Sequence, residues 1–471
     1  MLSKDKFYAV ILAGGQGSRF WPQSRTLEPK QFLSLQRDKS LFEQTLQRIK
    51  PLIPAKNTII VTSELYRHQI YEFIKPFDVP KDNLIFEPEG RNTAPSIAVA
   101  VQIIHQRDPL AHVCVMPCDH LIKNNRRFIK IIRQALGLCK DSLVVFGIPP
   151  HRPATGYGYI QAGNRQGIFL KVKKFSEKPD LATAQRFLKD GSYFWNSGIF
   201  AGSSRIFLEE FKNRLPVLYR QLKKINCLDD IAKVWKQVKP ISFDYGILEK
   251  SARLLMLPAK GLGWSDLGSW QAWDEAMKKD KQANLLKADV INLQSKNITV
   301  VGSNRLIATI GLKDLIIVDT ADALLITDKN KTEQVKTVVD ILKKSGRQEH
   351  YTHRTVKRPW GHFTVLESGD GFKVKLVEVK PKHSLSLQYH NKRSEHWVVV
   401  DGRAQIIKGK KSCVLKANES IYVPVGCVHR ITNPGDKALK IIEVQAGVYL
   451  QENDIVRLND SFGRLNQTTK G

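Results

Sequence analysis

The chain has 471 residues, of which 42% are hydrophobic and 25% are charged. This composition is typical of a protein folded in water, and no apolar run approaches the ~20 residues of a membrane-spanning helix, so we expect no membrane partner. The formal net charge of +29 attracts anions such as nucleotides and sugar phosphates. Because the basic residues are scattered and no RNA-binding signature is present, the charge does not predict binding to nucleic acid.

Length and cysteine content narrow the class of protein further. At about 150 residues per domain, the length predicts two or three domains. The chain begins Met1-Leu-Ser-Lys-Asp-Lys and runs directly into an apolar stretch, which leaves no room for a signal peptide. The six cysteines form no Cys-x-x-Cys pair, so we expect unpaired thiols in a reducing compartment. Together these features predict a cytoplasmic protein.

The first element in chain order is an apolar strand followed by a glycine-rich loop. Residues 9–12 predict the strand, and the loop then reads Gly-Gly-Gln-Gly-Ser-Arg before the sequence PKQF at 29–32. Glycine lets the backbone turn sharply and bring its N–H groups against a polyanion. The spacing matches neither the dinucleotide fingerprint nor the ATPase loop. The loop therefore predicts phosphate binding of another kind, with basic side chains nearby at Arg19 and Lys30.

Short apolar strands alternate with helical segments from residue 9 to about 275. Strands are predicted at 58–62, 113–117, 143–148 and 199–201, and helices at 95–106 and 180–189. This alternation predicts an α/β fold with a doubly wound, mostly parallel sheet. The ligand site of such a sheet lies at the carboxyl ends of its strands.

Two aspartates lie where strands end. Asp119 follows the strand at 113–117, and Asp266 lies within the stretch GWSDLGSW at 263–270. Mg²⁺ is usually held by one or two carboxylates together with phosphate oxygens and water, which suits the neutralisation of a nucleoside triphosphate. The two aspartates are therefore candidate Mg²⁺ ligands, although an isolated aspartate is more often a helix cap or a turn residue.

The pattern changes to short strands beyond residue 283. Regularly spaced β-branched runs between 290 and 326 predict a small β-helix-like unit, followed by a helix at 331–344. Residues 345–350 are polar and predict a linker. The strands after it are broken by glycine, proline and asparagine turns, which predicts an all-β barrel or jelly roll. The expected domains are thus 1–282, 283–345 and 351–471.

Seven motifs follow one another in the first half of the chain. They are AGGQGSRFWPQSR with PKQF, EPEGRNTAP (87–95), MPCDH (116–120), TGYGYI (155–160), FSEKPD (175–180), WNSGIF (195–200) and GWSDLGSW. In content and order they closely resemble the mannose-1-phosphate guanylyltransferases. The resemblance implies that the 1-phosphate of mannose attacks the α-phosphorus of GTP in line and releases pyrophosphate, without a protein nucleophile.

The same resemblance implies roles for individual residues. The catalytic set is Arg19, Lys30, Asp119 and Asp266, with Mg²⁺ shared by the two aspartates. The GTP phosphates are assigned to Gly14, Gly15, Gly17, Arg19 and Lys30, and the rest of the nucleotide to Glu87, Arg91, Asn92 and Thr93. Lys178 would bind the sugar phosphate, and Gly156, Glu177 and Asn196 would address the mannose hydroxyls. For Glu87 and Asn196 a purely structural role as a turn cap stays open.

Eight further motifs follow in the second half. They are RPWG (358–361), FKVK (372–375), LSLQYH (385–390), SEHWVVVDG (394–402), VPVGCVH (423–429), NPG (433–435), IEVQAGVYLQENDIVR (442–457) and SFGR (461–464). They resemble the type II mannose-6-phosphate isomerase domain, a cupin. The whole chain therefore resembles the bifunctional isomerase/guanylyltransferases of GDP-mannose supply for polysaccharide biosynthesis, and the second half is expected to interconvert fructose 6-phosphate and mannose 6-phosphate.

Four residues of the second half form a cupin-like ligand set. The Gln-x-His pair Gln388 and His390 places both side chains on one face of a strand, Glu395 follows, and His429 comes from a distant Pro-x-Gly-x-x-His turn. A divalent ion is expected there, and Zn²⁺ is the favoured metal. The residue that moves the proton between carbons is not identified by these motifs. Candidates for acid–base chemistry or phosphate contact are His396, Arg430 and Arg457.

Two departures from the family pattern leave an alternative open. Residues 391–393 read Asn-Lys-Arg where the family has a His-rich run, and Lys382 replaces the glycine that usually follows Pro381. One rival hypothesis is therefore a guanylyltransferase whose cupin is inactive and structural. A second rival, suggested by the net charge, is a nucleic-acid-binding protein built on the same sheet. Association into a homo-oligomer is also left open.

Overall fold

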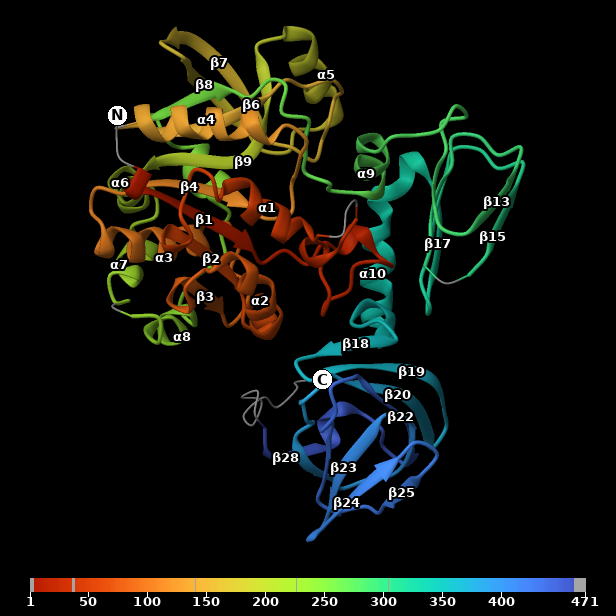
Figure 1. Cartoon of the computed structure of the whole chain (residues 1–471). Helices are drawn as coiled ribbons and strands as arrows, with labels where there is room; N and C mark the ends of the chain where they lie inside the picture. The colour runs from red at the N-terminus through yellow and green to blue at the C-terminus, as the bar shows by residue number, and fades with distance from the viewer. Residues whose placement is uncertain (1–3, 36–38, 140, 226, 304, 461–471) are drawn as a thin grey trace. The chain divides into compact units, whose positions relative to one another are not determined.

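The computed structural model describes residues 4–35, 39–139, 141–225, 227–303 and 305–460, so the motif at 461–464 lies outside the described residues. The chain divides into two compact units, residues 1–350 and 351–471 (Figure 1). No helix within the described ranges is long and apolar enough to cross a membrane. The six cysteines are present as free thiols.

A nine-stranded sheet organises the first unit. The strand order is β3-β2-β1-β4-β9-β6-β10-β8-β7. The strands are β1 (Phe7–Ala13), β2 (Thr58–Ser63), β3 (Leu84–Glu87), β4 (His112–Pro117), β6 (Leu143–Ile148), β7 (Tyr159–Gln166), β8 (Phe169–Ser176), β9 (Tyr193–Ser203) and β10 (Leu254–Pro258). A separate ribbon pairs β5 (Leu121–Ile122) with β11 (Trp264–Ser265). The strands predicted at 58–62, 113–117, 143–148 and 199–201 are confirmed.

The sheet is more mixed than the sequence predicted. The ladders β3-β2-β1-β4 are parallel, but β9 runs antiparallel to both of its neighbours, β4 and β6. The first residues of β9 also pair with β7 before the strand enters the centre of the sheet. Because a strand that is buried on both faces is apolar whichever way it runs, the sequence pattern did not distinguish the direction of β9.

Helices cover both faces of this sheet, as the doubly wound prediction requires (Figure 1). They are α1 (Leu41–Ile49), α2 (Arg67–Ile74), α3 (Thr93–Arg107), α4 (Asn125–Leu138), α5 (Leu181–Asp190), α6 (Ser204–Arg214), α7 (Pro216–Leu222), α8 (Asp230–Trp235) and α9 (Trp270–Ala276). Alternate side chains of β1 enter two different cores: Ile11 packs with α1, α2 and α4, whereas Val10 packs with α3 and α6. A capping box formed by Ser40 and Glu43 fixes the start of α1.

The segment after the sheet is a short β-helix. Its strands are β12 (Leu285–Lys287), β13 (Val290–Leu293), β14 (Thr299–Val301), β15 (Ile307–Ile310), β16 (Leu315–Asp319) and β17 (Leu324–Asp328). Parallel ladders join β12, β14 and β16 on one side and β13 with β15 on the other, and β17 closes the first ladder in the antiparallel direction. The predicted helix begins as a 3₁₀ turn (Lys329–Gln334) and continues as α10 (Val335–Lys344).

One apolar cluster joins this β-helix to the sheet domain. Phe20 and Trp21, which follow the glycine-rich loop, pack in the same cluster as Trp270 and as Ile316 and Val339 of the β-helix segment. Burial of such aromatic side chains stabilises the fold strongly. The β-helix therefore supports the segment that carries the glycine-rich loop.

The stretch predicted as a linker is held by the first unit. The indole Nε1 of Trp21 donates a hydrogen bond to the carbonyl of Glu349 at 2.8 Å. The backbone N–H of Thr26 donates to the carbonyl of His350 at 3.1 Å. Both acceptors lie on a 3₁₀ turn (Gln348–His350). These contacts extend the first unit to His350.

A fragment that ends at His350 is expected to be more stable than one that ends at Lys344. The shorter fragment loses the acceptors of Trp21 and Thr26, and each hydrogen bond contributes about 1 kcal/mol. The expected difference is on the order of 2 kcal/mol, or a few degrees in Tm for a domain of this size. Thermal unfolding of the two fragments measures it, and equal Tm values would show that residues 345–350 do not support the first unit.

The second unit is a jelly roll of two antiparallel sheets, as predicted. The sheets have the orders β18-β19-β20-β27-β22-β25 and β24-β23-β26-β21-β28. The strands are β18 (Thr355–Arg358), β19 (Gly361–Gly369), β20 (Phe372–Val379), β21 (Leu387–His390), β22 (Arg393–Asp401), β23 (Arg403–Lys408), β24 (Lys411–Lys416), β25 (Ser420–Val423), β26 (His429–Thr432), β27 (Leu439–Gly447) and β28 (Ile455–Asn459). Val377, Trp397, Ile406 and Ile431 belong to the core between them.

Candidate active sites

The glycine-rich loop leaves β1 at the carboxyl end of the sheet. Gly17 has φ 60°, and a Cβ on it would lie 2.4 Å from Cβ of Lys30, so both conformation and space require glycine there. A Cβ on Gly14 would lie 3.7 Å from a carboxylate oxygen of Glu87, and Gly15 faces open space. Gly14 and Gly15 are exposed and free to approach a ligand.

The buried ammonium group of Lys30 contacts the carboxylate of one predicted Mg²⁺ ligand and the backbone of the other. Its Nζ lies 2.6 Å from Oδ2 of Asp119 and donates to the backbone carbonyls of Asp266 at 2.8 Å and Leu267 at 3.1 Å. Although burial raises the pKa of Asp119, the charge of Lys30 outweighs it and holds that pKa below its usual range. Because an ammonium group has three donors, a phosphate that contacted Lys30 would have to replace one of these partners.

Asp266 is oriented by its own hydrogen bonds. Its Oδ1 accepts from the hydroxyl of Tyr157 at 2.8 Å and from the backbone N–H of Gly268 at 2.9 Å. Burial, with the neighbouring Asp266, raises the pKa of Tyr157, which therefore stays a protonated donor. Tyr157 was not predicted as a site residue, although it lies inside the quoted motif TGYGYI.

The predicted nucleotide-side residues are close together, but several have structural partners. Glu87 at the end of β3 is buried, which raises its pKa to about 7, and its carboxylate accepts a hydrogen bond from Ser96. Asn92 has φ 68° and caps α3 by accepting from Thr93 N–H at 2.8 Å. The hydroxyl of Thr93 in turn accepts from the backbone N–H of Phe243. The turn-cap role left open for Asn196 is supported, because its Oδ1 accepts a hydrogen bond from the backbone N–H of Gly198 at 3.2 Å, whereas Glu87 accepts from a helix side chain and caps no turn among the described residues.

Both predicted arginines on this side form ion pairs. Arg91 pairs with the carboxylate of Glu89. The Nε of Arg19 lies 2.8 Å from Oε2 of Glu333, a residue of the β-helix segment. A phosphate contact by either arginine competes with these exposed carboxylates.

Asp244, which the sequence did not predict as a site residue, lies beside the predicted sugar-side residues. Lys178 Nζ lies 2.9 Å from Oε1 of Glu177, and Asn196 Nδ2 donates to Oδ1 of Asp244 at 2.9 Å. Burial, with the nearby charge of Glu177, raises the pKa of Asp244 to about 6. Asp244 begins a π-helical turn (Asp244–Leu248). Such turns are frequent at functional sites but leave no clear sequence pattern.

The glycines of the motif TGYGYI have different surroundings. A Cβ on Gly158 would lie 2.6 Å from Oε2 of Glu177, whereas nothing lies within 4 Å of a Cβ on Gly156. Gly158 is therefore the glycine that lets the backbone pass Glu177. The open space at Gly156 remains compatible with the approach of a sugar.

The second unit brings together the predicted metal ligands. His390, Glu395 and His429 are each 2% exposed, and one ligand atom from each lies within 4.8 Å of the others. His390 Nε2 lies 3.0 Å and His429 Nε2 3.8 Å from the carboxylate oxygens of Glu395. Gln388 Nε2 lies 3.5 Å from His429 Nε2. All four residues thus share one interior site.

Neighbouring side chains orient this ligand set. Glu395 accepts hydrogen bonds from Arg393, Trp397 and Gln445 at 3.0–3.2 Å. Burial raises its pKa, but the neighbouring His390 and Arg393 outweigh burial and hold the carboxyl ionised. The Nδ1 of His429 donates to the carbonyl of Cys427 at 2.9 Å, which leaves Nε2 toward Glu395. A buried carboxylate with two imidazoles is a donor set that suits Zn²⁺ and similar divalent ions.

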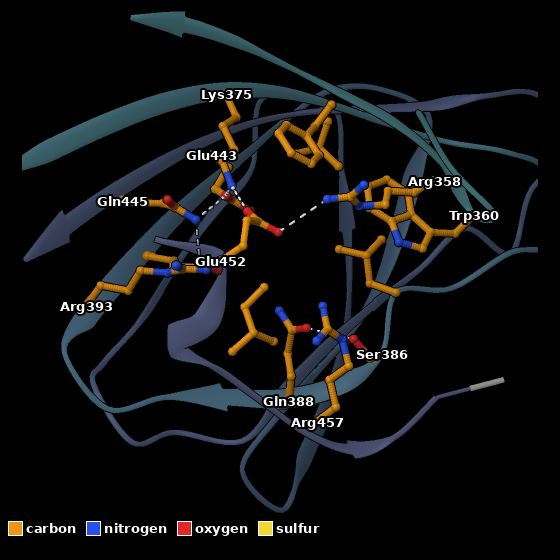
Figure 2. A pocket seen from close by; sticks show the side chains of 15 residues that line it. Arg358, Trp360, Lys375, Ser386, Gln388, Arg393, Glu443, Gln445, Glu452 and Arg457 are labelled. Atoms are coloured by element: carbon orange, nitrogen blue, oxygen red, sulfur yellow. Dashed lines mark hydrogen bonds and ion pairs between the residues drawn. The ribbon is translucent and has the colours of Figure 1, made fainter. Parts of the chain in front are cut away.

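The structure separates the three acid–base candidates of the second unit. Arg457 lines the pocket beside Gln388 (Figure 2). His396 is exposed on the opposite face of β22 from Glu395, with its ring near that of Tyr422, and is not brought to the ligand set. Arg430 follows His429 on β26 and is not among the residues that line the pocket. Strand alternation next to Glu395 already predicts the outward face for His396.

The pocket wall holds charged residues to which the sequence assigned no role. Lys375, Glu443 and Glu452 lie together on one side, and Arg358 reaches in from another (Figure 2). Their motifs, FKVK and IEVQAGVYLQENDIVR, were recognised as part of the resemblance. The motifs indicated the fold, but not which of their side chains share a cavity.

The two sites define a nucleotidyl transferase fused to a cupin, and comparison with known proteins identifies both parts. Residues 8–283 match the family described as nucleotidyl transferase, residues 288–342 the MannoseP isomerase/GMP-like beta-helix domain, and residues 345–460 the mannose-6-phosphate isomerase C-terminal domain. The chain belongs to the bifunctional mannose-6-phosphate isomerase/mannose-1-phosphate guanylyltransferase family.

Full-length relatives support this membership. The chain is 38% identical to the mannose-1-phosphate guanylyltransferase of Escherichia coli, over 98% of this chain and all of that protein. It is 40% identical to the alginate biosynthesis protein AlgA of Pseudomonas aeruginosa, over 97% of each chain. A crystal structure titled mannose-1-phosphate geranyltransferase from Thermus thermophilus aligns with 72% of this chain and 99% of its own, at 30% identity and a TM-score of 0.65.

Proposed function

We propose that the first unit makes GDP-mannose and pyrophosphate from GTP and mannose 1-phosphate. The observation that carries this proposal is that Lys30, directly beside the glycine-rich loop, pairs with the carboxylate of Asp119 and donates to the backbone carbonyl of Asp266. A loop for phosphates and two carboxylates at one edge of the sheet are what nucleotidyl transfer requires. The names of the relatives add the guanine nucleotide and the mannose phosphate.

The residues of the first site act by position and charge. Backbone N–H groups of Gly14 and Gly15 face the triphosphate, and Asp119 with Asp266 would hold Mg²⁺, which neutralises phosphate charge when bound. Lys30 keeps Asp119 ionised and orders the segment of Asp266. Because the attacking oxygen belongs to the substrate, no protein nucleophile is needed.

We infer that Lys178, Glu177, Asn196 and Asp244 form the sugar side. Lys178 supplies a cation for the 1-phosphate, and the carboxylate and amide groups accept and donate hydrogen bonds to the hydroxyls of mannose. The ion pair of Lys178 with Glu177 sets the starting position of its ammonium group. A phosphate at this place would share that ammonium group with Glu177.

Replacing Lys178 by alanine is expected to weaken the binding of mannose 1-phosphate more than the binding of GTP. A charge-assisted hydrogen bond contributes about 1.5–3 kcal/mol, so KM for mannose 1-phosphate should rise on the order of 10- to 100-fold. Initial rates with each substrate varied in turn measure the split, and Lys189→Ala, an exposed lysine of α5, is the matched control. Equal rises in both KM values would contradict the assignment.

We propose that the second unit interconverts fructose 6-phosphate and mannose 6-phosphate. The buried set Gln388, His390, Glu395 and His429 fits a divalent ion, and we propose Zn²⁺. Such an ion polarises the oxygens on C1 and C2 when bound. Arg457, which lines the same pocket, is proposed to contact the 6-phosphate.

The two reactions are not consecutive, because mannose 6-phosphate must first become mannose 1-phosphate. We therefore propose two independent sites in one cytoplasmic enzyme that supplies GDP-mannose for a polysaccharide, as the names of the xanthan and alginate biosynthesis proteins suggest. A homo-oligomer is compatible with this proposal. Separate assays of the purified chain, one with GTP, mannose 1-phosphate and Mg²⁺ and one with fructose 6-phosphate, test both halves.

A further inference from the structure

A network of four charged side chains lines the cupin pocket outside the metal-ligand set. Lys375 on β20 is 5% exposed, and its Nζ lies 3.1 Å from Oε1 of Glu452 and 3.6 Å from Oε1 of Glu443. Arg358 Nη2 approaches the other oxygen of Glu452 at 3.7 Å. Figure 2 shows these groups opposite Gln388 and Arg457, with the pocket between them.

The two carboxylates of this network differ in what surrounds them. Glu452 is paired with two cations, Lys375 and Arg358, which outweigh burial and lower its pKa. Among the described residues, Glu443 has the longer contact with Lys375 and accepts a hydrogen bond of 2.7 Å from the neutral amide of Gln445. Burial, with the charge of Glu395 nearby, raises the pKa of Glu443 to about 7. When the environment drives the pKa values of two carboxyl groups apart in this way, one group typically stays ionised and the other can carry a proton.

Gln445 connects Glu443 to the metal-ligand set. Its Nε2 donates to Oε1 of Glu443 at 2.7 Å and to Oε1 of Glu395 at 3.0 Å. A substrate whose C1 and C2 oxygens faced the ligand set would therefore have these two carbons close to this side of the pocket. On this side, Glu443 is the carboxyl group with the raised pKa and Lys375 is an ammonium group, and an aldose–ketose conversion needs one proton carrier of each kind.

We propose that Glu443 is the catalytic residue that carries the proton between C1 and C2, and that Lys375 exchanges protons with O1 and O2. This inference rests on the proposed isomerase function. From mannose 6-phosphate, the Glu443 carboxylate takes the C2 proton, the C–H electron pair forms C1=C2, and O1 takes a proton from Lys375. In the second half, O2–H returns a proton to Lys375 as C2=O2 forms, and the C1=C2 pair takes the proton of Glu443 onto C1.

The test is Glu443→Gln in the full chain, assayed for isomerisation and for uptake of deuterium from ²H₂O into the substrate carbons. Loss of a positioned acid–base group costs on the order of 10²–10⁴-fold in rate, and we expect turnover and deuterium uptake to fall together. Bound metal, measured by elemental analysis, should match the unaltered chain. Glu378→Gln is the matched control, because Glu378 also lies on the cupin sheet but pairs with His362 rather than lining the pocket.

Each outcome bears on one of the two claims. If the unaltered chain with its metal does not interconvert the hexose phosphates, the proposed isomerase function fails. If the unaltered chain is active and Glu443→Gln keeps turnover and deuterium uptake, the role of Glu443 is overturned. Loss of metal in Glu443→Gln would also overturn it, because Glu443 would then support the ligand set. Partial recovery in Glu443→Asp, with metal retained, is expected for a carboxyl that carries the proton.

Discussion

Asp119→Asn is expected to abolish GDP-mannose formation while the protein stays folded. The amide keeps the size of the side chain and still accepts a hydrogen bond from Lys30, but it removes the charge that would hold Mg²⁺. Removal of one charged group from a site of this kind costs at least on the order of 10²–10³-fold in kcat. Asp266→Asn should have a similar effect.

Turnover at saturating Mg²⁺ measures the effect of these substitutions, and circular dichroism with thermal unfolding checks the fold. Asp141→Asn is the matched control, because Asp141 is an exposed residue whose ion pair with Arg205 lies on the surface. Isomerase activity should be unchanged in all three variants. Near-normal guanylyltransferase turnover in Asp119→Asn or Asp266→Asn would show that the altered aspartate is structural.

His390→Ala should remove isomerase activity and leave GDP-mannose formation intact. The substitution deletes one of the buried groups that approach Glu395 and leaves the carboxylate with a single imidazole partner. Such an incomplete set should lose bound metal and at least about 10²-fold in isomerase rate. All residues that we propose for guanylyl transfer belong to residues 1–350, so we expect this activity to persist.

Elemental analysis and the two activity assays measure this separation. His362→Ala is the control, since His362 pairs with Glu378 away from the ligand set. Loss of both activities in a folded His390→Ala protein would contradict the two-site account. Full isomerase activity would instead show that His390 is not a required metal ligand.

The positions of residues directly after apolar strands predicted which side chains lie at the ligand edge of the first unit, but not the contacts between them. Asp119 had to lie at the ligand edge because it directly follows an apolar strand of a wound sheet. Lys30 pairs with Asp119 and donates to the backbone carbonyl of Asp266. These contacts depend on how three loops fold back on one another. Asp244 was missed for the same reason, since its position depends on a π-helical turn.

In the cupin, the two-residue alternation of the strands predicted the face on which each side chain lies, but not which side chains of other strands it contacts. Gln388 and His390 are two apart on one strand and therefore share a face, as predicted. The same rule turns His396 away from Glu395. Glu443 and Lys375 also face inward, yet only the pairing of β20 with β27 brings them together across the sheet. Pairing between strands far apart in the chain is not contained in either motif.

Guanylyl transfer is tested most directly by incubating the purified chain with GTP, mannose 1-phosphate and Mg²⁺ and following both products. GDP-mannose and pyrophosphate should form in equal amounts, and no product should form when Mg²⁺ is chelated. Absence of GDP-mannose from a folded, Mg²⁺-supplied protein would contradict the assignment of the glycine-rich loop, Lys30 and the two aspartates to guanylyl transfer.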